Sequence, residues 1–352
     1  MAGGSRRRSQ SQPSCSDKNS SNFGGTTRNP KPETRNYPMS PQRAAFFDVG
    51  TNTILCLIAE MRDTGRFRII DDLHEIARLG QGVDRTGVIS AEGEARAGAV
   101  LARYLDQCKN LGVAEFHAVG TSAMRDAANS AEVRQRWRDQ LGLDVQVISG
   151  EQEAGYSFLA VQRSLSLLGQ ELLVIDIGGG STEFIRGDDN GVAEALSIDV
   201  GSVRLTERFL PSDPVRGEDT AALFETIDAQ LAPLQARWQG RVKLLTLVGI
   251  AATFTTLVAI EKKLARYAHN EVHGSQLTLE EVRRQRKMFE VKTIAERQQI
   301  VGLDPKRADV IYAGACLIER IMVVLANTRA IVSDQGVRYG LLHERLWQIK
   351  NC

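Results

Sequence analysis

The stretch from Leu172 to Arg186, LLVIDIGGGSTEFIR, constrains the fold more than any other part of the chain. An apolar run ends at three consecutive glycines, Gly178, Gly179 and Gly180, and apolar residues resume a few positions later. This pattern predicts a strand, a tight turn and a second strand. Because glycine lets a ligand approach the backbone closely, the N–H groups of the turn suit a phosphate group. The two hydroxyls that follow would assist, from Ser181 and Thr182.

Two carboxylates flank this turn. Asp176 lies in the first predicted strand, and Glu183 lies at the start of the second. Carboxylate oxygens are preferred ligands of hard divalent cations, so the pair predicts a site for Mg²⁺ or another divalent cation. A triple glycine taken alone fits a hinge or a bulge equally well.

A second copy of this arrangement favours the functional interpretation. The segment from Phe46 to Ile58, FFDVGTNTILCLI, again has an apolar run with an acid, Asp48, before a glycine and a polar series. Two such units could hold a polyphosphate from opposite sides, which predicts two domains of like design with the ligand between them. Asp48 would be a further metal ligand. The phosphate-binding residues of this second turn would be Gly50, Thr51, Asn52 and Thr53.

The composition is that of an ordinary water-soluble chain of 352 residues, 42% hydrophobic and 25% charged, long enough for two domains. Residues 1–43 are poor in apolar residues and carry eight Lys and Arg against two acids, which predicts a disordered basic tail. Subtracting the tail's six net positive charges from the chain's +1 leaves the remaining residues near −5. A broadly basic polyanion-binding surface is therefore not expected, and any polyphosphate site must be local.

The five cysteines show no C-x-x-C spacing, so neither a disulfide framework nor a zinc site is expected. Three of them lie in apolar surroundings and read as buried thiols: Cys56, Cys108 and Cys316. No signal peptide and no apolar run of 18 residues is present, so we expect a cytoplasmic protein without a membrane partner.

The paired motifs DVGTNT and DIGGGSTE, with ISGEQEA at Ile148 to Ala154 between them, resemble those of the exopolyphosphatase/guanosine-pentaphosphate phosphohydrolase (Ppx/GppA) family. The resemblance extends from about Ala44 to Leu346 and excludes the tail. The family belongs to the actin, Hsp70 and sugar-kinase superfamily, which implies an α/β fold of two actin-like (ribonuclease H-like) domains with an interdomain cleft. The implied domains are residues 44–168, joined by a C-terminal helix at 337–352, and residues 169–336.

The resemblance also implies roles for two residues outside the turns. Glu153 occupies the position of the family's proposed catalytic base, which orients and deprotonates a water. Local sequence alone fits a helix-capping acid as well, since Ser149 and two acids resemble a helix start. A helix N-terminus would keep this carboxylate ionised. Arg125, in the loop GTSAMRDA, would neutralise a phosphate oxygen as a second catalytic residue, or it is a solvated arginine at a helix start.

Two further segments complete the expected site. Gly201, Ser202 and Arg204 are a possible third contact with phosphate. Where the family has a glycine-rich turn, this chain has Ala251 and Ala252, which puts a nucleotide-base site like that of the kinases in doubt.

The expected reaction is hydrolysis of the terminal phosphoanhydride of inorganic polyphosphate with Mg²⁺, releasing orthophosphate. Guanosine pentaphosphate is the alternative substrate. A small-molecule kinase and a non-catalytic sensor of alarmones or polyphosphate remain the other classes. No specific nucleic acid is expected as a partner, and a homodimer is possible by resemblance.

Overall fold

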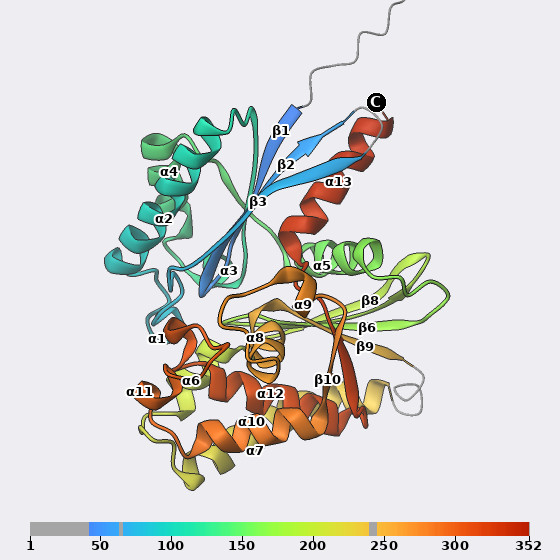
Figure 1. Cartoon of the computed structure of the whole chain (residues 1–352). Coiled ribbons are helices and arrows are strands. Elements are labelled where there is room, and N and C mark those ends of the chain that lie inside the picture. The colour runs from blue at the N-terminus through green and yellow to red at the C-terminus, as the bar shows by residue number, and fades with distance from the viewer. Residues whose placement is uncertain (1–41, 63–65, 239–244, 352) are drawn as a thin grey trace, which may run out of the picture. The chain divides into compact units, whose positions relative to one another are not determined.

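The computed structural model describes residues 42–62, 66–238 and 245–351 (Figure 1). Residues 1–41 of the predicted basic tail lie outside the described residues. Residues 42 and 43, which we assigned to the tail, already belong to the first strand, so the folded segment begins by residue 42.

The first sheet has five strands in the order β3-β2-β1-β4-β5. Strand β1 runs antiparallel to β2 and parallel to β4, and β4 runs parallel to β5. Alternate residues of β1 enter different cores, because successive side chains of a strand point to opposite faces. Phe47 packs with α2 and α4, whereas Phe46 packs with α13. The strands are β1 (Gln42–Val49), β2 (Thr53–Met61), β3 (Phe67–Ile76), β4 (Glu115–Gly120) and β5 (Val145–Val147).

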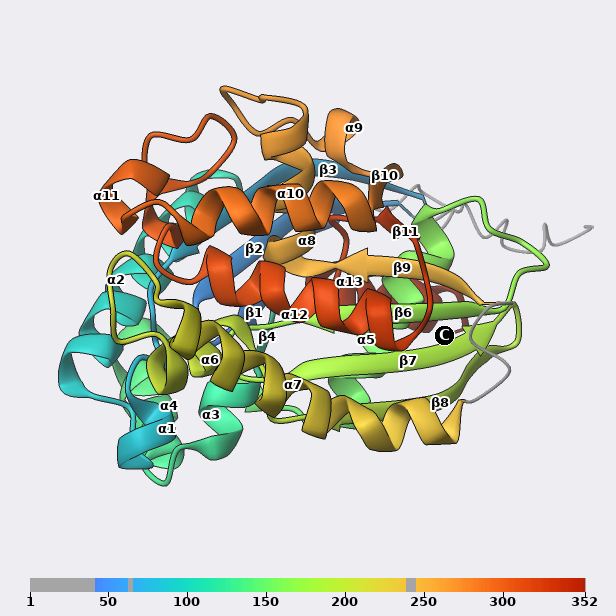
Figure 2. The same ribbon diagram turned by 90° about the horizontal axis from the view of Figure 1, so that it is seen from below.

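The second sheet repeats this arrangement with one strand added. Its order is β10-β11-β9-β6-β7-β8, with β6, β7 and β8 antiparallel and β6, β9 and β11 parallel. Figure 2 shows α7, α10 and α12 lying across one face of it. The strands are β6 (Leu172–Ile177), β7 (Thr182–Asp188), β8 (Gly191–Ile198), β9 (Thr246–Ile250), β10 (Ser275–Thr278) and β11 (Arg329–Val332).

Helix α5 lies between the two sheets (Figure 1). Its Phe158 and Val161 pack on the second sheet, and its Ala160 joins the core formed by β1, β2 and α13.

The helices are α1 (Val83–Thr86), α2 (Ala91–Asn110), α3 (Ser122–Asp126), α4 (Ser130–Leu141), α5 (Gly150–Ser164), α6 (Ser202–Phe209), α7 (Gly217–Arg237), α8 (Ala251–Glu261), α9 (His269–Val272), α10 (Leu279–Glu290), α11 (Ile294–Arg297), the 3₁₀ helix η2 (Pro305–Arg307), α12 (Ile311–Val324) and α13 (Val337–Asn351).

The predicted α/β class and the two actin-like sheets are confirmed. In each sheet three antiparallel strands are followed by parallel ones in the same spatial order. The division into domains at residues 168 and 169 stays a prediction. Ser149 caps α5 as expected, Ser90 caps α2, and the three cysteines predicted to be buried are buried. No helix in the described ranges is both long and apolar enough to cross a membrane.

One expectation about the second half is wrong, and one helix there was not expected. The charged segment from Thr278 to Arg297 predicts a single helix with Thr278 as its N-cap, but that helix ends at Glu290, because Thr293 and Glu296 form a capping box that begins α11. The 21-residue helix α7 was not predicted from the sequence. It carries a proline at position 233, and it buries Leu223, Ile227, Leu231 and Leu234 along one face.

Ala251 begins α8 with a φ of +66°, in the left-handed region. A non-glycine residue there costs about 1–3 kcal/mol of strain. We predict that Ala251→Gly raises the free energy of unfolding by about 1 kcal/mol, the relieved strain exceeding the added entropy of the unfolded chain. Ala252→Gly, one residue further into the helix, should lower it by about 0.5–1 kcal/mol. Urea denaturation of both variants checks this, and equal effects would contradict it.

Candidate active site

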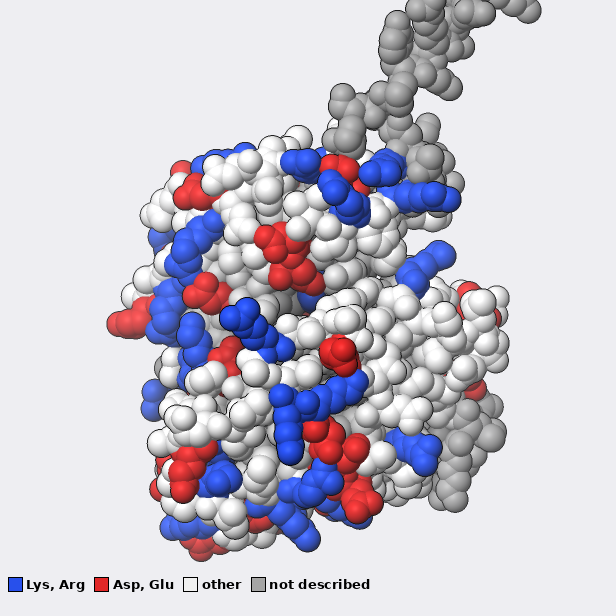
Figure 3. Space-filling view, viewed as in Figure 1, with Lys and Arg blue, Asp and Glu red and all other residues white. Residues whose placement is uncertain are grey.

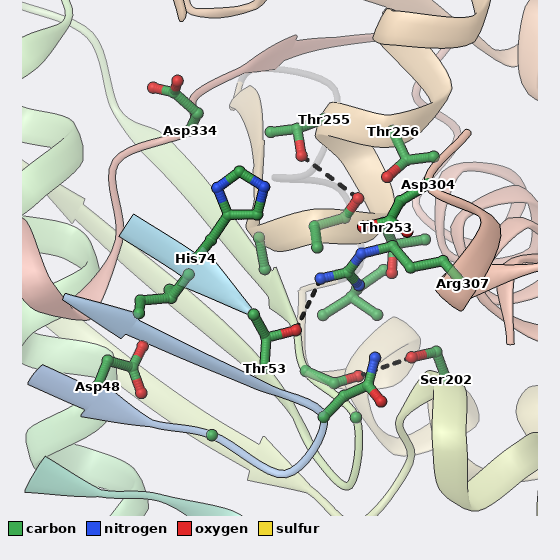
Figure 4. A pocket seen from close by; sticks show the side chains of 18 of the residues that line it. Asp48, Thr53, His74, Ser202, Thr253, Thr255, Thr256, Asp304, Arg307 and Asp334 are labelled. Carbon is green, nitrogen blue, oxygen red and sulfur yellow. Dashed lines mark hydrogen bonds between the residues drawn. The ribbon is translucent and has the colours of Figure 1, made fainter. Parts of the chain in front are cut away.

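A cavity of about 680 Å³ is lined by the turns at the ends of both sheets. Its walls come from β1, β2 and β3 of the first sheet and from the loops, α8 and η2 of the second half (Figure 4). Most of the site residues expected from the sequence line it: Asp48, Gly50, Thr51, Asn52, Thr53, Glu153, Asp176, Gly178, Gly179 and Ser181.

Four of the expected residues do not line this cavity: Arg125, Gly180, Thr182 and Glu183. The hydroxyl of Thr182 is buried and donates to the carbonyl of Val200 at 2.5 Å, so it is not free for a phosphate. The carboxylate of Glu183 is buried behind the wall and accepts a hydrogen bond from Ser197 Oγ at 2.8 Å.

The glycine turn between β6 and β7 is held from behind by α6. The N–H groups of residues 202–204 and the Nε of Arg204 donate to the carbonyl oxygens of residues 178–180 at 2.8–3.1 Å. In a trans peptide the N–H points away from the carbonyl, so the N–H groups of residues 179–181 point away from α6. None of these three N–H groups has an acceptor within the described residues. Successive free N–H groups of this kind bind anions.

The turn between β1 and β2 is built in the same way. The carbonyl oxygens of Thr51 and Asn52 accept hydrogen bonds from the N–H groups of residues 77, 78 and 80 at 2.8–3.0 Å. The N–H groups that follow these carbonyls are therefore turned to the opposite side. The two turns are in contact, because a Cβ on Gly179 would lie 3.0 Å from the Cβ of Thr51.

Three carboxylates beside these turns are buried, those of Glu153, Asp176 and Glu183, and a fourth, that of Asp48, is partly buried. Burial, followed by repulsion from Glu153 and Asp176, raises the pKa of Asp48 to about 8. Burial also raises the pKa of Asp176 to about 6. The same causes that act on Asp48 raise the pKa of Glu183 well above its usual value. Without a nearby cation, burial and mutual repulsion therefore favour the protonated, neutral forms of these carboxyls.

Glu153 lies in the first turn of α5 and is 8% exposed. The expectation that the helix N-terminus keeps it ionised is opposed by burial, which raises its pKa to about 7. Arg125 limits this rise, since its Nη1 donates to Glu153 Oε2 at 2.6 Å. A carboxyl that titrates near neutrality and is held in one orientation suits a general base.

The carboxylates fit part of a divalent cation site. The Oδ1 of Asp48 is buried and has no hydrogen-bond partner within the described residues. No three His, Cys, Asp or Glu side chains of the described ranges converge as a complete ligand set. Mg²⁺ commonly takes one or two carboxylates and completes its shell with water and phosphate oxygens. Asp48 and Asp176 are the candidates because both line the cavity, whereas Glu183 is buried and does not line it.

Arg307 was missed from the sequence. It ends η2, points into the cavity and donates from Nη2 to Thr53 Oγ1 at 2.7 Å (Figure 4). Burial lowers the pKa of its guanidinium to about 10, although Asp304 and Asp309 lie near it. No carboxylate in the described chain forms a hydrogen bond or ion pair with Arg307. Its remaining donors are available to an anion.

The part of the cavity beyond Arg307 was also missed. Here Tyr267 and His269 both hydrogen-bond to Asp334, and the ring of His74 packs edge-on against Tyr267. Burial alone would raise the pKa of Asp334, but His273, His269 and Arg338 hold it below its usual value. These residues come from segments separated by up to 260 positions, so no local pattern could have joined them.

The expected third phosphate contact is only partly placed on the cavity. Ser202 lines it, whereas Arg204 faces Asp84 and Asp126 instead. On the face seen in Figure 3 acidic and basic side chains are interspersed, in keeping with the absence of a broadly basic surface.

Comparison with known proteins identifies relatives over most of the chain. The model of the Ppx/GppA phosphatase family matches residues 57–348. Exopolyphosphatase 2 of Mycobacterium tuberculosis is 33% identical over 315 residues, which cover 86% of this chain and 98% of that protein. An exopolyphosphatase from Cytophaga hutchinsonii has a crystal structure that is similar with a TM-score of 0.81 and 30% identity, covering 87% of this chain and 98% of that one.

Other relatives are longer. The bifunctional 3-dehydroquinate synthase/phosphatase of Fusobacterium nucleatum is 31% identical over 85% of this chain, but the match spans only 46% of that protein. The guanosine-5'-triphosphate,3'-diphosphate pyrophosphatase of Vibrio atlanticus is 26% identical over 87% of this chain and 60% of its own length.

The raised pKa values predict a pH-dependent stability of the cation-free protein. The folded state retains a proton on Glu153 up to about pH 7, whereas the unfolded chain releases it near pH 4.5. The free energy of unfolding should therefore fall as the pH rises from about 5 to 8. Glu153→Gln should become progressively more stable relative to the wild type over that range, measured by urea denaturation in EDTA. A stability difference that does not change with pH would contradict this, and Glu132→Gln, an exposed substitution on α4, is the control.

Proposed function

The chain belongs to the Ppx/GppA phosphatase family, and on that premise we propose that it hydrolyses the terminal phosphoanhydride of inorganic polyphosphate and releases orthophosphate. The match to this chain covers nearly the whole length of two relatives named exopolyphosphatase, which supports this substrate class.

The pair of opposed turns is the observation that carries the proposal. Each turn has carbonyl oxygens held from behind, so its N–H groups point away from those partners, and residues of both turns line one cavity. Backbone N–H groups and the guanidinium of Arg307 would bind the oxygens of consecutive phosphates. Catalysis of phosphoryl transfer depends mainly on positioning and charge neutralisation, which this arrangement supplies.

Glu153 is the base in the proposed reaction. A water in the cavity donates its proton to the carboxylate of Glu153 while its oxygen forms a bond to the terminal phosphorus. The bond between that phosphorus and the bridging oxygen breaks, and the shortened chain leaves with the bond's electron pair. Arg125 holds the carboxylate in place through the hydrogen bond of 2.6 Å, so it acts on Glu153 rather than on the phosphate.

Asp48 and Asp176 would hold Mg²⁺ or a similar cation beside the turns. When bound, the cation would neutralise charge on the phosphate oxygens. Its positive charge would also favour the ionised forms of the buried carboxylates, whose pKa values are raised without it.

Guanosine pentaphosphate is the second candidate substrate, converted to the tetraphosphate. The far part of the cavity favours it, because Tyr267, His74 and the apolar Leu264 offer a planar and partly apolar surface that a bare phosphate chain does not need. The acid Asp334 in the same region would accept hydrogen bonds from a base but would repel phosphate.

The substitution Glu153→Gln tests the hydrolase. It preserves the size of the side chain but removes the base, so orthophosphate release should fall by about 10²–10⁴-fold. The affinity for tripolyphosphate should change only slightly. Release is measured with Mg²⁺ on long-chain polyphosphate and guanosine pentaphosphate in parallel, and the faster substrate is the preferred one.

An unchanged turnover in Glu153→Gln would remove this residue from the mechanism. Binding by the wild type without any release would favour a sensor. ATP consumption that requires an added phosphoryl acceptor would favour a kinase.

The substitution Arg307→Ala tests the phosphate contact found only in the structure. Removal of a charge-assisted hydrogen bond of about 1.5–3 kcal/mol should weaken tripolyphosphate binding by about 10- to 100-fold. Isothermal titration calorimetry with Mg²⁺ measures it. Arg320→Ala is the matched control, since Arg320 pairs with Asp228 and does not line the cavity. Equal affinities of the two variants would contradict the assignment.

A further inference from the structure

Arg204 has three partners and none of them lies on the cavity wall. Its side chain is 12% exposed. Its Nε donates to the carbonyl of Gly180 at 2.8 Å, its Nη2 pairs with Asp126 Oδ2 at 2.5 Å, and its Nη1 pairs with Asp84. The three acceptors belong to three different segments of the chain.

Each of these segments carries part of the proposed site. Gly180 belongs to the glycine turn between β6 and β7. Asp126 is the last residue of α3 and follows Arg125 directly, and Arg125 bonds to the base Glu153. A displacement of Asp126 would therefore move the residue that orients Glu153.

Asp84 connects Arg204 to the turn between β1 and β2. It lies in α1, in the loop that follows the residues whose N–H groups hold the carbonyls of that turn. The next helical turn of α6 adds two contacts to the same loop. Arg208 pairs with Asp84 at 2.5 Å, and the N–H of Gly82 donates to Glu207 at 3.0 Å.

The glycine turn is packed so closely against its neighbours that it has little space to shift relative to them. A Cβ on Gly180 would lie 2.4 Å from Ser122 Oγ, and one on Gly201 would lie 2.4 Å from the carbonyl oxygen of Gly179. The glycine turn is thus enclosed by α3 on one side and by α6 on the other. A shift of either helix would change the spacing between the two sets of N–H groups.

We propose that Arg204 is a positioning residue that sets the two phosphate-binding turns and the Arg125–Glu153 pair in register for in-line attack. A planar guanidinium can donate in three fixed directions at once, whereas a lysine ammonium at the end of a flexible chain has no such fork. The inference rests on the proposed function, because register matters most when water, base and phosphorus must align.

The test compares Arg204→Lys with Arg208→Lys. Both substitutions keep the positive charge. Arg204 and Arg208 both lie on α6 and both pair with Asp84, but only Arg204 contacts the glycine turn and Asp126. Because misplacement of reacting groups by about 1 Å can cost 10²-fold, Arg204→Lys should lower kcat for orthophosphate release from tripolyphosphate by about 10- to 100-fold. Arg208→Lys should keep kcat within about threefold of the wild type, since Arg208 is half-exposed and contacts neither the glycine turn nor Asp126. The two variants should have similar melting temperatures.

Asp126→Asn provides a second route if Arg204→Lys does not fold. It should lower kcat to a similar extent, and the double variant should lose little more than either single variant, because the two residues act through one contact. Equal kcat values for Arg204→Lys and Arg208→Lys, or losses that multiply in the double variant, would overturn the proposal.

A binding measurement separates this proposal from the failure of the proposed function. If the wild type releases no orthophosphate, the proposed hydrolase activity is wrong. The role of Arg204 in aligning the two turns is then tested by calorimetry with tripolyphosphate and Mg²⁺. Arg204→Lys should then bind about tenfold more weakly than Arg208→Lys, because one phosphate chain must contact both turns. Equal affinities would overturn the role of Arg204.

Discussion

The hydrogen bonds that hold the carbonyl oxygens of the two turns decide what the rest of the site can bind. A turn left to itself would present both acceptors and donors to a ligand, and its carbonyl oxygens would repel phosphate. Here the start of α6 takes up the carbonyls of residues 178–180, and the segment after β3 takes up those of residues 51 and 52. What remains facing inward is a set of N–H donors on each side.

This donor-lined cavity is paired with carboxylates that are costly to bury. Asp176 and Glu183 stand directly opposite each other on β6 and β7, a position where like charges are destabilising. Their pKa values rise, together with those of Asp48 and Glu153, because burial and mutual repulsion favour the neutral forms. Carboxyl groups with strongly shifted pKa values cluster at functional sites, and this group fits a site that a cation and a phosphate chain occupy together.

The turns could be predicted from the sequence because each is a local pattern of apolar run, acid, glycine and hydroxyl. The α/β class followed from their repetition and from the family resemblance. The pattern could not say which way each side chain faces, and so Thr182 and Glu183 were expected on the cavity, although Val200 after β8 and Ser197 in β8 bind their polar groups. Arg307 could not be predicted either, since it becomes a neighbour of Thr53 only when chain segments 254 positions apart meet.

The central claim is that a water molecule attacks the terminal phosphorus of a polyphosphate held between the two turns. The most direct test is ³¹P NMR of the products formed from tripolyphosphate and Mg²⁺ in ¹⁸O-labelled water. The account predicts orthophosphate with a single ¹⁸O atom and pyrophosphate without label, because the oxygen that joins the terminal phosphorus comes from water. Label in the pyrophosphate, or orthophosphate without label, would contradict it.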